Sequence, residues 1–200
     1  IEMLTKPNTI LFMQSLKKYF FSFLLLFLAM GCAQQEMEQE ETTTEPATDF
    51  SEAVAVVHPT ENGDATGHVT FTKVEDGVRV QGEFEGLEEG KHGFHIHQYG
   101  DCRAADGTSA GGHYNPADNP HAGPDAESRH VGDMGNLETD ADGNASIDYV
   151  DNTITLNGPE SIMGRGVIIH AGEDDLESQP TGAAGARMGC GVIGVANTDM

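Results

Sequence analysis

The histidines are the residues of this sequence whose spacing most suggests chemistry. The chain has nine histidines, and six of them fall in a series of short segments: GFHIHQYG, SAGGHYNP, PHAGP, RHVGD and GVIIH. These six are His95, His97, His113, His121, His130 and His170. Asp133 lies in the fourth segment, three residues after a histidine. The clustering predicts that these side chains act as a group.

The spacing of His95 and His97 indicates how the group could bind metal. On a strand, residues two apart point to the same side, so both imidazoles can bind one ion. Imidazoles suit copper and zinc, and one carboxylate among three imidazoles, such as Asp133, suits tetrahedral zinc. The pattern therefore predicts a histidine site for one metal ion or two. Spacing alone does not identify the reaction.

The sequence around these residues predicts eight short strands with few helical segments. The strands span 53–58, 67–75, 78–84, 92–98, 134–139, 145–150, 165–170 and 190–196. Asp76-Gly77 is a strong hairpin signal, and apolar residues alternate after it, as a half-buried strand requires. We expect an all-β fold, an eight-stranded antiparallel Greek-key barrel or sandwich that is immunoglobulin-like.

Two predicted connections, 100–132 and 171–189, are longer than the rest. Long ordered loops usually carry function, and the histidines and two cysteines lie in or beside these two. We therefore expect both loops to be functional.

The charge of the chain narrows its partners. There are 33 acidic and 10 basic residues, which give a net charge of -23. Nucleic acid is excluded as a partner, because neutralising phosphates needs clustered Lys and Arg. So many acids are typical of a solvated, self-repelling surface.

The segment 13–32, MQSLKKYFFSFLLLFLAMGC, is typical of a signal peptide. Its apolar run, 20–30, is shorter than a membrane-spanning helix requires. The ending at Cys32 resembles a bacterial lipobox, in which the cysteine is lipidated; the alternative is an ordinary signal peptide cleaved nearby. We assign residues 1–32 to this targeting region. Met13 is a plausible start of translation, so residues 1–12 can lie outside the translated protein.

The residues that follow divide into a tether and a domain. The segment 33–49 is acidic and polar and has no apolar periodicity, so we expect a disordered tether. The domain is 50–200. Export implies an oxidising compartment, and with Cys32 set aside, Cys102 and Cys190 are a natural disulfide pair.

Four segments, GFHIHQYGD, TSAGGHYNP, RHVGDMGN and GARMGCGVIG, resemble the successive signature segments of copper/zinc superoxide dismutases. The resemblance runs from about residue 53 to 196. It implies that copper is held by His95, His97, His113 and His170. It implies that zinc is held by His113, His121, His130 and Asp133. The ring of His113 would then bridge the two ions.

The resemblance also implies roles for residues around the metals. Cys102 and Cys190 would form the disulfide of the family, and Arg187 would lie beside copper. Asp174 would join a copper histidine to a zinc histidine and so fix both rings. The other three histidines, His58, His68 and His92, are not expected to be ligands. For His92 we expect structural hydrogen bonds beside the copper strand.

The activity that the resemblance implies is dismutation of superoxide to oxygen and hydrogen peroxide. Copper, one ion per subunit, would be reduced and reoxidised in turn. Zinc, also one per subunit, would support His113 as it transfers a proton. The place of action would be the periplasm or cell surface, with the protein anchored to a bacterial membrane by its lipid alone. A homodimer is one candidate assembly.

The sequence departs from the eukaryotic pattern in two ways, and the first of them, the position of Cys102, resembles the bacterial type. Cys102 follows Gly100-Asp101 directly, whereas eukaryotic members have this cysteine just before the TSAG segment. The second loop is short and lacks the lysines that steer superoxide in eukaryotic members. Our hypothesis is that Lys91, Arg103 or Arg129 replaces them.

Two other functions use the same features. One is a copper-delivery or metal-buffering module, which needs the ligands but no turnover. The other is a surface interaction protein on a metal-stabilised sandwich, since fold alone does not establish function. The presence of all six histidines together with Asp133 and Arg187 favours the enzyme.

Overall fold

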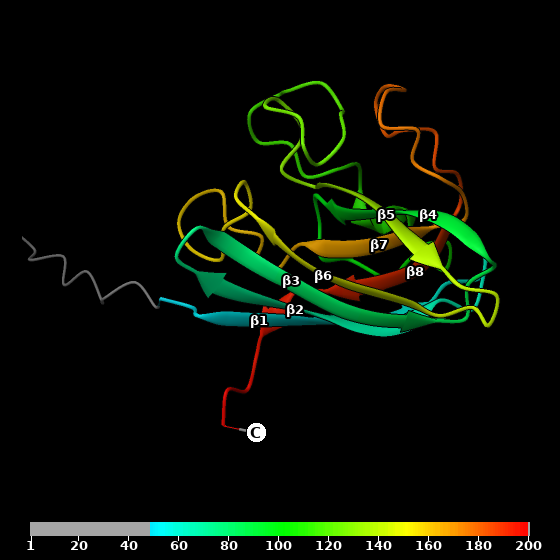
Figure 1. Ribbon diagram of the computed structural model, residues 1–200, viewed down its shortest axis with the longest axis horizontal. Coiled ribbons are helices and arrows are strands. Elements are labelled where there is room, and N and C mark those ends of the chain that lie inside the picture. Colours follow the sequence, from blue (N-terminus) through cyan, green and yellow to red (C-terminus); the bar gives the residue numbers. More distant parts are fainter. Residues whose placement is uncertain (1–48, 200) are drawn as a thin grey trace, which may run out of the picture. The chain divides into compact units, whose positions relative to one another are not determined.

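The computed structural model describes residues 49–199, which form a β-barrel with two long loops on one side (Figure 1). Eight strands build it: β1 (Glu52–Pro59), β2 (Thr66–Val74), β3 (Gly77–Glu85), β4 (Gly90–His97), β5 (Asp133–Thr139), β6 (Ala145–Asp151), β7 (Gly166–His170) and β8 (Arg187–Val192). A two-residue strand, β9 (Gly194–Val195), and one 3-10 turn, η1 (Thr108–Ala110), complete the elements of this part. The signal peptide, Cys32 and nearly all of the tether lie outside the described residues.

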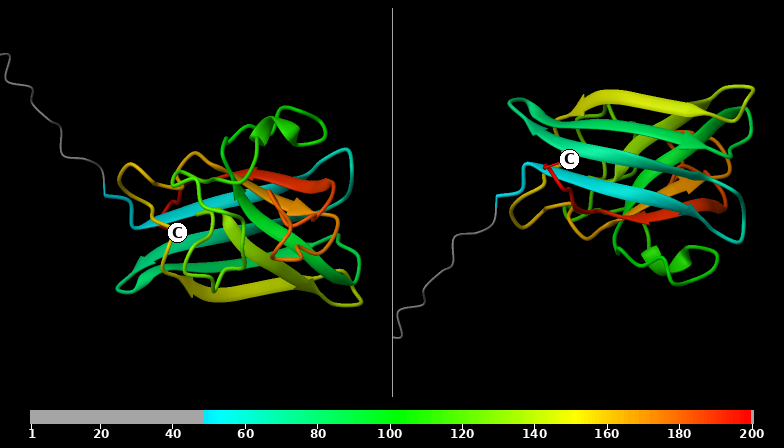
Figure 2. Two further views of the ribbon diagram at one scale, coloured as in Figure 1. Left: turned by 90° about the horizontal axis from the view of Figure 1, so that it is seen from above. Right: turned by 90° about the horizontal axis from the view of Figure 1, so that it is seen from below.

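The strands follow the order β5-β4-β7-β8-β1-β2-β3-β6, and every neighbouring pair is antiparallel. Strand β1 pairs with β2 along most of its length and with β8 at its end, so it joins the two halves of the barrel. Strands β5 and β6, at the ends of the order, also lie against each other. The two views of Figure 2 show the resulting nearly closed barrel. The prediction of an all-β antiparallel barrel is confirmed.

The strand ends differ from the prediction mainly near the C-terminus. The predicted strand 190–196 is divided between β8 and β9, and β9 pairs with β1. Strand β8 also begins earlier than predicted, at Arg187. The second long loop is therefore 171–186. A third long connection, 152–165, was not predicted to be distinctive. It places Ile154, Leu156 and Ile162 in the core, so it has a packing role.

The two halves of the barrel bury their strands differently. In β3, Val78, Val80 and Phe84 are buried while the residues between them face outward, except for a buried glycine. Strand β7 is buried at every position, as is most of β4. In these strands one side packs into the barrel core, so something else must cover the other side. The two long loops, which Figure 1 shows beside β4, β5 and β7, provide this cover.

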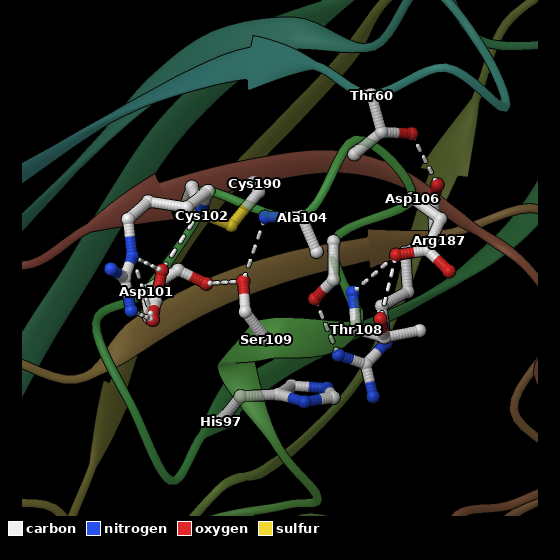
Figure 3. Close-up of a disulfide and its surroundings, with 12 residues drawn as sticks. Thr60, His97, Asp101, Cys102, Ala104, Asp106, Thr108, Ser109, Arg187 and Cys190 are labelled. Atoms are coloured by element: carbon white, nitrogen blue, oxygen red, sulfur yellow. Dashed lines mark hydrogen bonds and ion pairs between the residues drawn. A yellow bond between two sulfur atoms is a disulfide. The ribbon is translucent and has the colours of Figure 1, made fainter.

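A disulfide ties the first long loop to the barrel (Figure 3). Cys102 in the loop is bonded to Cys190 on β8, and the pairing that we predicted is confirmed. Cys190 packs with Ile168 and Ala110 in a small cluster on the outer side of β7. The loop is thus held to the barrel by a covalent bond and by apolar packing.

Phe50, at the start of the domain, is held by the third long connection, 152–165. Phe50 is attached to the barrel because its N–H donates to Asn157 Oδ1 (2.8 Å) and its carbonyl accepts from Asn157 Nδ2 (2.9 Å). Within residues 49–199, no helix is long and apolar enough to cross a membrane.

Removing the disulfide should destabilise the protein. The two cysteines are 88 residues apart. Crosslinking a loop of that length lowers the entropy of the unfolded chain and so raises the free energy of unfolding by at most about 4–5 kcal/mol. Replacing both Cys102 and Cys190 with Ser should lower the urea midpoint of unfolding, measured by circular dichroism. An unchanged midpoint would show that the crosslink contributes nothing to the free energy of unfolding.

Candidate metal centre

The strands place three histidines on the covered side of the barrel. On β4, Phe94 and Ile96 point into the core, so His95 and His97 between and after them point outward, beneath the loops. His170 ends β7 and faces the same way. The register shifts at His95 and at His170, each a bulge-like irregularity of the kind that redirects side chains near active sites.

The first long loop brings His113 to the same place. His113 forms an isolated antiparallel bridge with His97, flanked by hydrogen bonds from Gln98 N–H to Gly112 O (2.8 Å) and from Tyr114 N–H to Ile96 O (2.8 Å). The loop therefore runs beside β4 like a short extra strand. This backbone pairing fixes where the ring of His113 begins.

One group of four histidines gathers here: His95, His97, His113 and His170. All four are buried, and one ring nitrogen from each lies within 4.8 Å of the others. Two rings are oriented by the backbone. His97 Nδ1 donates to Gly111 O (2.8 Å), and His170 Nδ1 donates to Gly185 O (3.0 Å). Their Nε2 atoms consequently face each other across 3.4 Å.

A second buried group consists of His113, His121, His130 and Asp133. The Nδ1 atoms of the three histidines lie 2.7, 2.8 and 3.0 Å from a single oxygen, Asp133 Oδ1. The other oxygen of Asp133 accepts from the N–H groups of Ala122 (3.1 Å) and His130 (2.9 Å). These bonds fix the carboxylate at the middle of the group.

Both groups fit metal ions. One carboxylate oxygen has two lone pairs, so three Nδ1–H donors exceed what it can accept, whereas a cation takes lone pairs from all of them. In tetrahedral zinc coordination the ligand nitrogens are about 3.3 Å apart, and His113 Nδ1 and His130 Nδ1 are separated by 3.4 Å. In the other group, His95 Nδ1 and His113 Nε2 are buried without a hydrogen-bond partner. A metal ion would satisfy both nitrogens.

Asp174 joins the two groups from the second long loop. Its Oδ2 accepts from His95 Nε2 (2.7 Å) and its Oδ1 accepts from His121 Nε2 (2.9 Å). All three side chains are inaccessible to solvent. With Nε2 engaged, each ring turns its Nδ1 toward its own group. The linking position that we predicted for Asp174 is the one it occupies.

Burial sets the protonation of the first group. Desolvation lowers the pKa of His95 to about 4 and that of His170 to about 3, and it lowers the pKa of His97 well below its usual range. These rings are therefore neutral at pH 7 and can offer lone pairs to a metal.

The carboxylates have the opposite effect on the second group. Burial lowers the pKa of His121, but hydrogen bonds and charge from Asp133 and Asp174 outweigh it and leave this pKa raised. Burial raises the pKa of Asp133, but hydrogen bonds from His113, Ala122 and His121 outweigh it and leave this pKa lowered. Asp133 is thus ionised, as a zinc ligand must be.

Arg187 lies beside His97, and Figure 3 shows the two side by side. Its two terminal nitrogens donate to Gly107 O and Gly111 O, both at 2.6 Å. Gly111 O also accepts from His97, so one carbonyl orients both side chains. Burial lowers the pKa of Arg187 while the charge of Asp106 opposes this, and a guanidinium remains charged at neutral pH.

The remaining histidines and basic residues have other positions. His92 is buried, and its Nδ1 and Nε2 lie 2.9 Å from the carbonyls of His170 and Glu88, which agrees with the structural role we expected. His58 and His68 are exposed on the barrel and belong to neither group. The hypothesis that Arg129 steers substrate is wrong, because this side chain is buried and bonded to Asp151.

Lys91 and Arg103 are exposed at the surface, as substrate steering requires. Each is nevertheless paired with an acid, Lys91 with Glu173 (3.0 Å) and Arg103 with Asp101 (2.7 Å). Such exposed pairs cancel much of the field of the base. The steering hypothesis for these two residues stays a prediction.

Two residues of the site were missed by the sequence analysis. Asn136 binds both backbone groups of Asp174, donating to its carbonyl (2.9 Å) and accepting from its N–H (2.8 Å). Gln179 binds the backbone of His121 in the same manner. These contacts join residues 38 and 58 positions apart, and no local pattern signals them.

The fold and the two groups define a β-barrel metalloprotein with two adjoining histidine sites. Residues 65–193 match the family model for copper/zinc superoxide dismutase. The chain is 50% identical over 143 residues to an extracellular superoxide dismutase [Cu-Zn] of Drosophila melanogaster, covering 68% of this chain and 78% of that one. It is 43% identical over 163 residues to the protein of the same name from Brugia pahangi, covering 77% and 79%.

A solved structure of the clock protein EA4 is also similar, with a TM-score of 0.69 and 42% identity over 76% of this chain and 99% of that chain. The chain belongs to the copper/zinc superoxide dismutase family. It is accordingly an oxidoreductase of superoxide, with copper and zinc as cofactors, and the predicted enzyme class is confirmed.

The relatives bear on the finer predictions as well. Both are eukaryotic enzymes described as extracellular, which supports secretion. They give no support to the bacterial type that we predicted from the position of Cys102, nor to a lipoprotein signal.

The lowered pKa values predict how the metal-free protein responds to acid. The folded pKa values of His95 and His170 lie below the unfolded value of about 6.5, so the unfolded state binds more protons as the pH falls. The contribution of these two neutral rings to the free energy of unfolding is fully present above pH 6.5. It should fall by about 2 kcal/mol or more between pH 7.5 and 5. Urea unfolding of the metal-stripped protein measures this. A midpoint that is constant or rises toward pH 5 would contradict it.

Proposed function

We propose that the first group holds copper and the second holds zinc, and that the protein uses them to dismutate superoxide outside the cytoplasm. The copper ligands are His95, His97, His113 and His170. The zinc ligands are His113, His121, His130 and Asp133. The observation that carries the proposal is the position of His113, the one residue common to both groups within the described part of the chain. Its Nδ1 lies 2.7 Å from Asp133 Oδ1, and its Nε2 is buried without a hydrogen-bond partner in the described part of the chain.

When bound, copper supplies the one-electron reduction and oxidation that convert two superoxide ions to oxygen and peroxide, and zinc supplies a fixed positive charge. The chain itself holds and moves the proton. With Nδ1 of His113 committed to the zinc group, only Nε2 of that ring can take up and release a proton toward substrate. The lowered pKa values of His95 and His170 keep those rings from competing for it.

Arg187 is the residue that we propose for binding the superoxide anion. Two of its five N–H donors are fixed by carbonyls, which orients the guanidinium plane and leaves further donors for the substrate. The short range of this contact matters because the protein carries a net charge of -23. At physiological salt the Debye length is about 8 Å, so distant acids are screened while Arg187 acts directly.

We propose that the protein is exported by the predicted signal peptide, with Cys32 as the site of lipidation.

We also propose that the protein forms a homodimer. Three exposed valines, Val56, Val192 and Val195, lie on the neighbouring strands β1, β8 and β9. Exposed apolar clusters on soluble proteins are typical of interfaces. This face is therefore the candidate contact with a second copy of the chain.

Replacing Arg187 tests the proposed activity against a pure metal-binding role. Arg187→Ala should lower kcat/KM for superoxide about 10- to 100-fold, because it removes a charged hydrogen bond to the substrate. Copper and zinc contents, measured by elemental analysis, should stay the same. Arg187→Lys, which keeps the charge but loses the planar fork, should fall between the two. Full activity in Arg187→Ala would leave only a metal-buffering role.

Replacing Cys32 tests the anchor. Cys32→Ser should move the protein from the membrane fraction to the soluble fraction of expressing cells, because a lipidated cysteine is lost. Blotting of the separated fractions measures this. Continued association with membranes would exclude lipidation at this residue, and soluble wild-type protein would favour the ordinary signal peptide.

A further inference from the structure

The side chain of Gln179 connects the two long loops directly above the proposed zinc group. Its Oε1 accepts a hydrogen bond from His121 N–H (2.8 Å), and its Nε2 donates to His121 O (2.8 Å). One planar amide thus satisfies both backbone groups of a single residue, as a neighbouring strand would. The same Nε2 donates to Glu177 O (3.1 Å), which fixes the amide within its own loop.

His121 depends on these two bonds. Its side chain is inaccessible, and in the described part of the chain its N–H and C=O have no hydrogen-bond partner besides Gln179. Buried backbone groups need partners, so losing the amide would leave two of them unpaired or open to water. The short segment around His121 has no strand or helix to hold it.

The second loop holds the ring of His121 as well as its backbone. Asp174 accepts from His121 Nε2, and Asp174 belongs to the same loop as Gln179. Three points on one residue, the N–H, the C=O and Nε2, are therefore bound by a single segment. With these fixed, the remaining ring nitrogen, Nδ1, has one direction, which is toward Asp133 (2.8 Å).

The loop that presents Gln179 is a compact turn. Asp175 accepts from the N–H groups of Glu177 (3.0 Å) and Ser178 (2.7 Å), and Gly182 N–H donates to Ser178 O (2.7 Å). Gly182 has a positive φ, and a Cβ there would lie 1.7 Å from Asp174 Oδ1 and 2.8 Å from His121 Nε2. The turn therefore packs directly onto the carboxylate and the ring that it positions.

From these contacts we infer that Gln179 is a positioning residue for zinc: its amide holds His121 so that Nδ1 is directed at the ion. The inference rests on the zinc role proposed above for His121. It assigns to the short second loop a task separate from steering superoxide. Residues that hold a metal ligand in place typically contribute 10- to 100-fold to metal affinity.

Two substitutions separate the halves of the contact. Gln179→Leu removes both hydrogen bonds to His121, together with the one to Glu177, with little change in size. Gln179→Glu keeps an oxygen that can accept from His121 N–H but has no donor for His121 O. The matched control is Gln81→Leu, because Gln81 is exposed on β3, far in the sequence from both loops, and bonds only to the exposed Asp148.

The experiment measures zinc affinity of the metal-stripped full-length protein by competition with a chromophoric chelator. We expect Gln179→Leu to bind zinc about tenfold more weakly than Gln81→Leu, with Gln179→Glu between them. Hydrogen exchange at the His121 amide should speed up in Gln179→Leu. Because two backbone groups of His121 lose their partner, the melting temperature of the metal-free protein should also fall below that of the control. The loss of zinc affinity is therefore the readout that separates a positioning role from a merely structural one.

His121→Ala makes the outcomes distinguishable. If His121→Ala loses zinc while Gln179→Leu binds it within twofold of the control, the positioning role is overturned and the zinc site stands. If His121→Ala binds zinc as tightly as the wild type, the proposed zinc site fails, and the inference fails with it. A lower melting temperature of metal-free Gln179→Leu with unchanged zinc affinity would reduce Gln179 to a structural residue.

Discussion

A buried imidazole has two nitrogens, and for four of the six rings of the metal centre the fold satisfies one so that the other is directed inward. Backbone carbonyls do this for His97 and His170, and the carboxylate of Asp174 does it for His95 and His121. His113 differs, because both of its nitrogens are needed. Its place is set by backbone pairing beside β4, and its Nδ1 is directed at Asp133.

This constraint explains why the barrel buries both sides of β4 and β7. Ligands on the outer side of a sheet would normally be solvated, and water would compete for every nitrogen. The loops exclude it, and the disulfide between Cys102 and Cys190 holds the first loop down. The first loop approaches β4 so closely that one position has no room for a side chain: a Cβ at Gly132 would lie 2.0 Å from the Ile96 carbonyl oxygen.

The charge of the protein and that of its substrate have the same sign, so the arrangement of charge matters more than its sum. Asp133 and Asp174 are fully enclosed, and their charges are directed at histidine rings. Arg187, beside His97, is oriented by carbonyls, whereas the exposed Lys91 is tied to Glu173. Short-range contacts at the site can therefore attract an anion that the surface as a whole repels.

The sequence by itself determined the all-β class and a histidine metal site, because strand alternation and histidine spacing are local patterns. The disulfide pair followed from the number of cysteines, and the division of the ligands into two groups followed from the resemblance to copper/zinc superoxide dismutases. It did not determine that β8 begins at Arg187, or that Arg129 is buried against Asp151. Nor could it reveal Asn136 and Gln179, whose amides bind backbone groups 38 and 58 residues away. Such contacts depend on how two loops meet in space, so only the tertiary structure decides them.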